Sequence, residues 1–330
     1  MKRIISVTMI CAIMLSIFAL VGCEPKAATL KLGLGVYSTA SATDATEDKD
    51  GQGQATVTVA AVLVDDDGKI VKAFVDCADS KVGYTAEGKA VATTSFKTKY
   101  ESGNDYGMTN PAYGGTATKE WYEQADAFCT LIVGKTSNEV AALVADNAKG
   151  TDEVIKAGCT IYVAEFAKAI EKAIAGATVS NATKNDTLKL GVSTAQTTTD
   201  ANEDKDGTNK IETTVFAAAV NADGKVVAAV SDCVEVTFTF DTAGASTFNA
   251  PETLLSKKQK GDDYGMKNPT YGSAKEWYEH AAAFDAACVG KTANEIEGLM
   301  GTDSKGNADL QSAGCTIDVS GFVKAASKIK

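Results

Sequence analysis

The tetrapeptide Ala-Gly-Cys-Thr occurs twice in this 330-residue chain, at 157–160 and at 313–316. Each copy precedes a run of residues with helical periodicity. Small residues beside a hydroxyl leave it open to another molecule. The first candidates for a chemical role are therefore the two threonines and the glycines before them, Thr160, Thr316, Gly158 and Gly314.

Other short motifs repeat in the same order along the chain. Most recur 156 residues later; Gly51, for example, corresponds to Gly207. A repeat of this length predicts a tandem duplicated domain and not a solenoid unit. We expect one repeat at 29–179 and a second at 187–330, with a polar linker at 180–186 between them.

The composition bounds the class of protein. Hydrophobic residues make up 45% of the chain, so each half can bury a core. The net charge of -11 and the pI of about 4.8 argue against nucleic acid or an anionic lipid surface as the main partner.

The N-terminus is typical of a bacterial lipoprotein. Residues 1–22 combine Lys2 and Arg3 with an apolar run that is too short for a lasting membrane span. The lipobox Leu-Val-Gly-Cys then ends at Cys23, which predicts lipidation of Cys23 and a short anchored linker at 23–28. The alternative is an ordinary secretory peptide in which Cys23 has no such role.

Residue patterns predict an α+β fold in each repeat, a mostly antiparallel sheet with packed helices. For the first repeat we expect a strand at 30–36, a polar loop at 38–54 and a hairpin of 56–64 with 69–75 around an Asp-Gly turn. A helix at 119–133, a second helix after the capping box at Thr136, a short strand at 159–163 and a helix at 165–174 follow. In the second repeat, the hairpin is expected at 213–230, a capping box at Thr292 and Ser320 as the cap of the last helix.

The ordered set of repeated motifs resembles the FMN-binding domains of bacterial surface lipoproteins of extracellular electron transfer. The set comprises Asp-Gly-Lys, Asp-Tyr-Gly-Met, Glu-Trp-Tyr-Glu, Gly-Lys-Thr and the late box that ends in Thr-Ile. The resemblance covers both repeats nearly end to end. In that family a flavin transferase joins the phosphate of FMN to a threonine hydroxyl within Asp-x-x-Ser-Gly-Ala-Thr.

The resemblance implies that Thr160 and Thr316 carry FMN through a phosphoester bond, one per repeat. Here the acid lies one residue too far from the threonine, as Glu153 and Asp309, and cysteine replaces the alanine of the box. The alternative is that both threonines are ordinary strand residues. Two similar boxes rank lower, because each lacks an equivalent in the other repeat; their threonines are Thr178 and Thr247.

Aromatic and basic residues of the repeats are further candidates. Tyr106 and Tyr264 lie in a glycine-bearing loop, where an aromatic side chain can meet a ligand. Lys99 and Lys257 lie near that loop and could offset phosphate charge, although solvated lysines are the simpler interpretation. The helical stripe that contains Trp121 and Trp277 favours a core position for both.

Six cysteines follow the lipobox, three in each repeat. Those in register are Cys77 with Cys233 and Cys159 with Cys315. Because disulfides are permitted outside the cytoplasm, we expect Cys77 to pair with Cys159 and Cys233 with Cys315. Buried free thiols are the alternative. His280 is the single histidine, and the chain has no pattern typical of a zinc, haem or iron–sulfur site.

The resulting expectation is a lipid-anchored flavoprotein on the outer side of the cytoplasmic membrane. Its partners would be a flavin transferase, a membrane quinol or dehydrogenase as electron donor and an extracellular acceptor such as ferric iron. The cofactor would supply the chemistry, so the chain is expected to be an electron carrier more than an enzyme. The alternative is a non-redox surface lipoprotein that binds a ligand or partner.

Overall fold

The computed structural model describes residues 29–268, 270 and 272–329. The predicted signal peptide at 1–22, the linker at 23–28 and the lipidation site Cys23 lie outside these residues. Within the described ranges, no helix is both long enough and apolar enough to cross a membrane.

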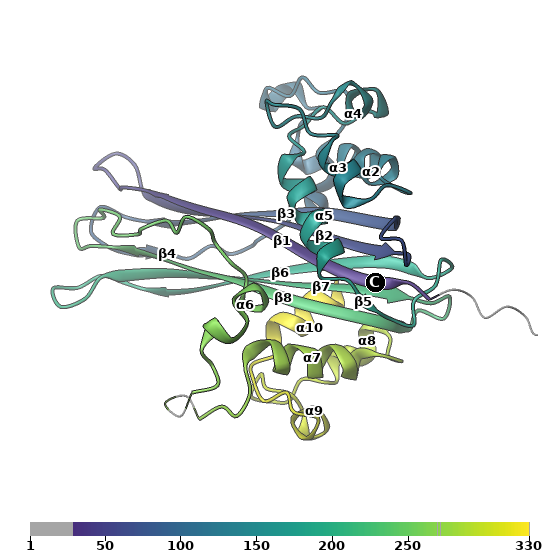
Figure 1. The fold of residues 1–330 in the computed structure, drawn as a ribbon. Coiled ribbons are helices and arrows are strands. Elements are labelled where there is room, and N and C mark those ends of the chain that lie inside the picture. Colours follow the sequence, from purple (N-terminus) through teal and green to yellow (C-terminus); the bar gives the residue numbers. More distant parts are fainter. Residues whose placement is uncertain (1–28, 269, 271, 330) are drawn as a thin grey trace, which may run out of the picture.

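The protein is α+β, with two antiparallel sheets and helices packed on them (Figure 1). One sheet has five strands in the order β4-β3-β2-β1-β5, and the other has three in the order β6-β7-β8. The strands are β1 (Lys31–Thr43), β2 (Gly51–Val64), β3 (Ile70–Tyr84), β4 (Ala90–Val91), β5 (Thr178–Val179), β6 (Thr187–Thr199), β7 (Gly207–Val220) and β8 (Val226–Phe240).

The helices fall into two groups, one for each sheet (Figure 1). The first group comprises α1 (Lys99–Ser102), α2 (Trp121–Leu131), α3 (Ser137–Ala141), α4 (Asp152–Ala157) and α5 (Ala164–Ala175), with 3₁₀ turns η1 (Gly103–Tyr106) and η2 (Pro111–Tyr113). The second group comprises α6 (Lys257–Lys260), η3 (Gly261–Tyr264), α7 (Trp277–Cys288), α8 (Ala293–Glu297), α9 (Ala308–Ser312) and α10 (Ser320–Ser327).

The two sheets pack face to face, and the helices cover their outer faces (Figure 1). β1 contacts β8, and β3 contacts β6. The core between the sheets includes Val57 and Val59 of β2 and Val215 of β7. Each sheet is therefore buried on both faces over much of its length, which explains why β2 and β7 are apolar without a clear alternation.

The predicted polar loop at 38–54 is wrong in most of its length. β1 continues to Thr43 and β2 begins at Gly51, so only the turn between them remains irregular. Ala40 and Ala42 pack against the inter-sheet core. The strands continue because the other half of the chain covers them, and that partner lies far away in the sequence.

The Asp-Gly hairpin is confirmed at its predicted place. Asp65 N donates to Lys69 O at 3.0 Å, and Gly68 has the left-handed backbone (φ 74°) that the turn requires. The same arrangement joins β7 to β8. Both outgoing strands are longer than predicted, since β3 extends to Tyr84 and β8 to Phe240.

Near the candidate threonines one prediction is wrong and one helix was missed. Residues 159–163 form no strand and make only a single bridge, between Lys149 and Tyr162. They are a turn that leaves α4, a helix that the sequence interpretation missed. α4 ends at Gly158, whose amide donates to Ile155 O at 3.0 Å.

The predicted helices are confirmed with shifted ends. The helix expected at 119–133 spans Trp121–Leu131, and the helix expected at 165–174 spans Ala164–Ala175. The capping boxes at Thr136 and Thr292 are confirmed. The predicted cap at Ser320 is wrong, because Ser320 lies within α10 and donates its own amide to Asp318 Oδ1 at 2.8 Å.

The segment expected to be a polar linker, 180–186, lies against the first strand. Leu30 N donates to Ala182 O at 2.7 Å, and Ser180 N donates to Leu30 O at 3.2 Å. Ala182 is fully buried. This segment, which follows β5 in the chain, therefore packs on the fold through Ala182, while Lys184 and Asn185 are exposed.

Candidate functional site

A cleft, here called cleft 1, lies on the outer face of the five-stranded sheet beneath its helices. Its volume is about 570 Å³, within the range of small-molecule sites. The floor includes Thr58 of β2 and Cys77 of β3, which are cross-strand partners. The walls carry one lysine and several aromatic side chains, Lys99, Tyr106, Trp121, Tyr162 and Phe166.

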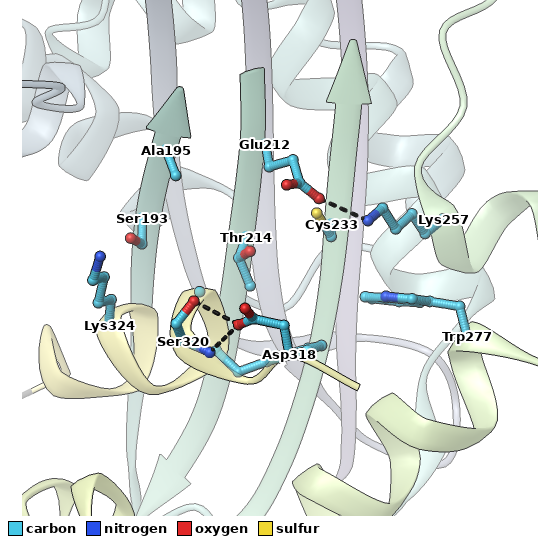
Figure 2. A pocket seen from close by; sticks show the side chains of 12 residues that line it. Ser193, Ala195, Glu212, Thr214, Cys233, Lys257, Trp277, Asp318, Ser320 and Lys324 are labelled. Atoms are coloured by element: carbon cyan, nitrogen blue, oxygen red, sulfur yellow. Dashed lines mark hydrogen bonds and ion pairs between the residues drawn. The ribbon is translucent and has the colours of Figure 1, made fainter. Parts of the chain in front are cut away.

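Cleft 2 lies at the corresponding place on the three-stranded sheet (Figure 2). Its larger part has a volume of about 700 Å³, and an adjoining hollow adds about 150 Å³. Thr214 and Cys233 are cross-strand partners here, as Thr58 and Cys77 are in cleft 1. The larger part is lined by residues that include Lys257, Tyr264, Trp277 and Thr316.

Repeated acids position the basic and aromatic walls of both clefts. Asp76 accepts a hydrogen bond from Tyr100 N at 3.1 Å and so fixes the start of α1, where Lys99 lies. Asp232 does the same for α6 through Lys258 N at 3.0 Å. The repeated Asp-Cys motif thus supplies a helix anchor and a cleft residue side by side.

The Glu-Trp-Tyr-Glu motif anchors the loop that carries Tyr106. Glu120 accepts hydrogen bonds from the amides of Met108 and Thr109, both at 3.0 Å. The pKa of Glu120 is lowered, mainly because the Thr109 side chain donates a hydrogen bond to its carboxylate. Glu276 holds the amides of Met266 and Lys267 in the same way, each at 2.9 Å, and so places Tyr264.

Lys257 is the centre of a closed ion-pair network in cleft 2. Its ammonium lies 2.9 Å from Glu212 Oε1 and 2.9 Å from Glu235 Oε2, and it points across the Trp277 ring (Figure 2). Lys210 contacts both acids, at 3.4 and 3.0 Å. Burial disfavours the charge of Glu235, but Lys257 and Lys210 together lower its pKa to about 2.

In the part of the chain that the structure describes, cleft 1 has no equivalent network. Thr56 and Gln54 stand in place of Glu212 and Lys210, and both donate hydrogen bonds to Asp79. Among the described residues, Lys99 forms no ion pair, and its ammonium lies 5.7 Å from the centroid of the Tyr106 ring. The two clefts therefore share their framework but differ in the electrostatics of the floor.

The candidate threonines lie on exposed turns at the edges of these clefts. Gly158 and Gly314 precede the turns with φ values of 98° and 102°. A Cβ on either glycine would lie within 2.3 Å of a lysine ammonium, that of Lys119 in the first half and of Lys275 in the second. The glycines thus allow both the left-handed turn and a close lysine.

Each threonine turn is held by one side chain of the preceding long helix, α2 or α7. The type of that side chain differs between the two halves. Gln124 of α2 accepts hydrogen bonds from Thr160 N at 2.8 Å and from the Thr160 hydroxyl at 3.0 Å. At the same place in α7, His280 Nδ1 lies 2.9 Å from Gly314 O and 3.3 Å from Thr316 N. Burial lowers the pKa of His280, which favours the neutral ring at pH 7.

The aromatic predictions have a mixed outcome. Trp121 and Trp277 are core residues as expected, each 5% exposed and packed on a phenylalanine of the last helix in its half. Both also form part of a cleft wall. Tyr106 and Tyr264 line the clefts, and their contact with a ligand stays a prediction.

Neither predicted disulfide is present in the structure. Cys77, Cys159, Cys233 and Cys315 are free and buried. Cys77 and Cys233 lie on strands in the cleft floors, whereas Cys159 and Cys315 follow the ends of α4 and α9. Burial raises the pKa of Cys77 and of Cys233 to about 12, so both thiols are protonated at neutral pH.

Some site residues were not found from the sequence. Gln124 and His280 align, yet nothing in the pattern indicated that they hold the threonine turns. Lys119 and Lys275 lie beside the glycines, whereas the lysines singled out for phosphate, Lys99 and Lys257, lie in the clefts. The lower-ranked Thr178 and Thr247 line neither cleft.

Comparisons of the chain with family models, curated proteins and solved structures find no match. Among the described residues, no three side chains of histidine, cysteine or acid are grouped to hold a metal ion. The functional assignment therefore depends on the geometry of the two clefts and their threonine turns.

Proposed function

We propose that the protein is a lipid-anchored extracytoplasmic flavoprotein. FMN would be joined through its phosphate to Thr160 and Thr316 and would relay electrons from the membrane to extracellular acceptors. One observation carries the proposal. In both halves an exposed threonine follows a left-handed glycine, with a lysine ammonium beside it, next to an aromatic-lined cleft.

The residues present fit such a group. Each turn offers a hydroxyl for a phosphoester, and Lys119 or Lys275 would balance the phosphate charge. Volumes of about 570 and 700 Å³ suit a planar ring system, and Tyr106 and Tyr264 offer aromatic faces to it. FMN would supply the redox chemistry that the protonated, buried thiols of the clefts lack.

We further propose that the two halves are a tandem duplication with one such site each. The 156-residue offset of the motifs supports this, as does the shared order of three long strands followed by helices, although among the described residues β4, β5 and η2 occur only in the first half. The partners in this proposal are a flavin transferase, a membrane quinol or dehydrogenase and an extracellular acceptor. The chain would bind, orient and hold the cofactor, as a carrier does.

A second candidate is a surface lipoprotein that binds a ligand reversibly in the clefts and carries out no redox reaction. The hydrogen bond of the Thr160 hydroxyl to Gln124 favours it, because that hydroxyl is already engaged. The cysteine before each threonine also departs from the box of the flavoproteins that the chain resembles.

The test is expression of the mature protein together with an active flavin transferase, followed by denaturation and removal of free flavin. The proposal expects flavin absorbance that stays with the denatured chain at about two flavins per molecule. The Thr160→Ala, Thr316→Ala double variant should lose it while keeping the melting temperature. Absorbance that washes out of the wild-type chain would favour reversible binding instead.

A further inference from the structure

The hydroxyl of Thr160 is engaged by a side chain of its own domain. It donates to Gln124 Oε1 at 3.0 Å, and the same oxygen accepts the Thr160 amide at 2.8 Å. Gln124 is itself fixed, because its Nε2 donates to Lys119 O at 3.0 Å and its side chain is buried. The hydrogen bond from the Thr160 hydroxyl to Gln124 must therefore break before this hydroxyl can react.

The hydroxyl of Thr316 is not engaged in this way. His280 replaces Gln124, and its Nδ1 lies 2.9 Å from Gly314 O and 3.3 Å from the Thr316 amide. Within the described part of the chain, the Thr316 hydroxyl has no hydrogen-bond partner. Thr316 also lines cleft 2, whereas Thr160 lies just outside the lining of cleft 1.

The residue two positions after each threonine adds to the difference. In the first half it is Tyr162, a large side chain over which the Lys149 ammonium lies at 5.5 Å from the ring centroid. In the second half it is Asp318, which is folded back onto the start of α10. Asp318 Oδ1 accepts from the Ser320 amide at 2.8 Å and from its hydroxyl at 2.6 Å (Figure 2). The approach to Thr316 is therefore lined by a smaller side chain.

From these differences we infer that the two threonines are not equivalent acceptors, and that Thr316 is modified ahead of Thr160. The inference rests on the proposed function, since it concerns the order in which the two proposed sites are loaded. Gln124 is the residue that delays Thr160, by holding its hydroxyl. His280 is a positioning residue that holds the turn by its backbone and leaves the hydroxyl free.

The transfer itself would be an exchange of phosphate bonds with a flavin dinucleotide as donor. The threonine oxygen forms a bond to the phosphorus on the flavin side, and the anhydride bond of the dinucleotide breaks. The nucleoside monophosphate leaves, and the hydroxyl proton passes to a base of the transferase. A hydroxyl that must first break a hydrogen bond of ordinary strength is expected to react about fivefold more slowly.

The experiment follows the two sites separately in the full mature chain. Unmodified protein is mixed with purified transferase and flavin dinucleotide, and samples are digested at intervals. Mass spectrometry then gives the modified fraction of the peptides that contain Thr160 and Thr316. We expect an initial rate at Thr316 about fivefold higher than at Thr160.

A reciprocal exchange of the positioning residues provides matched variants. Gln124→His should release the Thr160 hydroxyl and bring its rate close to that of Thr316, without changing Thr316. His280→Gln should slow Thr316 and leave Thr160 as it was. The melting temperature of each unmodified variant shows whether it folds. If one variant does not fold, the other alone is enough to test the inference.

The outcomes separate this inference from the proposed function. Equal rates at the two threonines, or a faster Thr160, would overturn the inference and leave the flavoprotein assignment in place. If neither Gln124→His nor His280→Gln changes the rate at its threonine, the roles of Gln124 and His280 are overturned. Modification of neither threonine by a transferase that modifies its own control substrate would overturn both proposals.

Discussion

At the scale of single residues, Asp285 shows how the cores of the two halves differ. It lies on α7 with 8% of its surface exposed and accepts a hydrogen bond from Ser231 N at 3.0 Å. Its Oδ1 and the Ser231 hydroxyl have no hydrogen-bond partner among the described residues. The corresponding residues of the first half are Val75 and Cys129, which have neither a carboxylate nor a hydroxyl to bury.

Asp285 gives the first prediction at this scale, an effect of pH on stability. Burial raises its pKa to about 6, so the folded state binds the proton more tightly than the unfolded state does. This contribution is therefore fully present below about pH 4 and is lost as the pH rises through about 6. Asp285→Asn should increase the free energy of unfolding at pH 7 by about 2 kcal/mol.

The measurement is urea denaturation of both proteins between pH 4 and pH 7. The stability of the wild-type chain should fall more steeply across this range than that of the variant. Some slope should remain in the variant, because burial also raises the pKa of Asp76 to about 6. Parallel curves for the two proteins would contradict the assignment.

The threonine turns show what residue types can and cannot predict. Both Thr160 and Thr316 are exposed, but the Thr160 hydroxyl donates a hydrogen bond to Gln124 and is not open as the small residues before it predicted. Their partners could not be identified, because Gln124 and His280 lie 36 residues earlier and act through a helix–turn contact. Register alone also favoured disulfides, although Cys77 and Cys159 lie on elements whose relative placement the sequence does not give.

At the scale of elements, the repeated motifs are mostly devices that fix loops to helices. Glu120 lies at the start of α2 and holds the loop after η1, while its own amide donates to Glu123 at 2.8 Å. One carboxylate thus joins the wall of cleft 1 to the helix that carries Trp121. The motif looks like a ligand-binding signature in the sequence, and its first residue is a structural anchor.

Glu120→Ala should therefore loosen the cleft wall without unfolding α2. We expect hydrogen exchange at the amides of Met108 and Thr109 to become roughly tenfold faster, because both lose a charged acceptor. Glu139→Ala is the matched control, since it removes the capping box of α3 but does not contact this loop. Unchanged exchange at the two amides in Glu120→Ala would contradict the anchoring role.

Elements with local signals were predictable, and elements defined by distant contacts were not. The Asp-Gly hairpin and the capping boxes at Thr136 and Thr292 depend on neighbouring residues, and all are present. The strand at 31–43 was predicted to end early, because its second part becomes buried only when the other sheet packs on it. α4 was missed because its first residues form no capping box, whereas the five-residue α3 has one at Thr136.

At the scale of the whole molecule, the two halves are joined by reciprocal contacts. Ala45 N donates to Gly244 O and Ala201 N donates to Gly88 O, both at 2.8 Å, and Tyr84 stacks on Phe240 with ring centroids 4.5 Å apart. The sequence predicted two domains with a linker. It did not predict that their sheets share a core, because no pattern within one repeat specifies the partner of its inner face.

This shared core predicts one cooperative unfolding transition for the whole chain. Asn209 is fully buried and donates to Gly83 O of the other half at 2.8 Å. Asn209→Leu leaves that carbonyl without its partner and should cost about 1–3 kcal/mol. The single transition in calorimetry should move to lower temperature as a unit, whereas two separate transitions would contradict a shared core.

Peptide mass spectrometry of the mature protein, taken from a cell with an active flavin transferase, shows whether the chain carries FMN and at which residues. We expect the peptides that contain Thr160 and Thr316 to be heavier by the mass of an FMN phosphoester. Modification of Thr178 or Thr247 instead would contradict the assignment of the site. If the chain stays unmodified although the transferase is active, the proposal that the protein is a flavoprotein is contradicted.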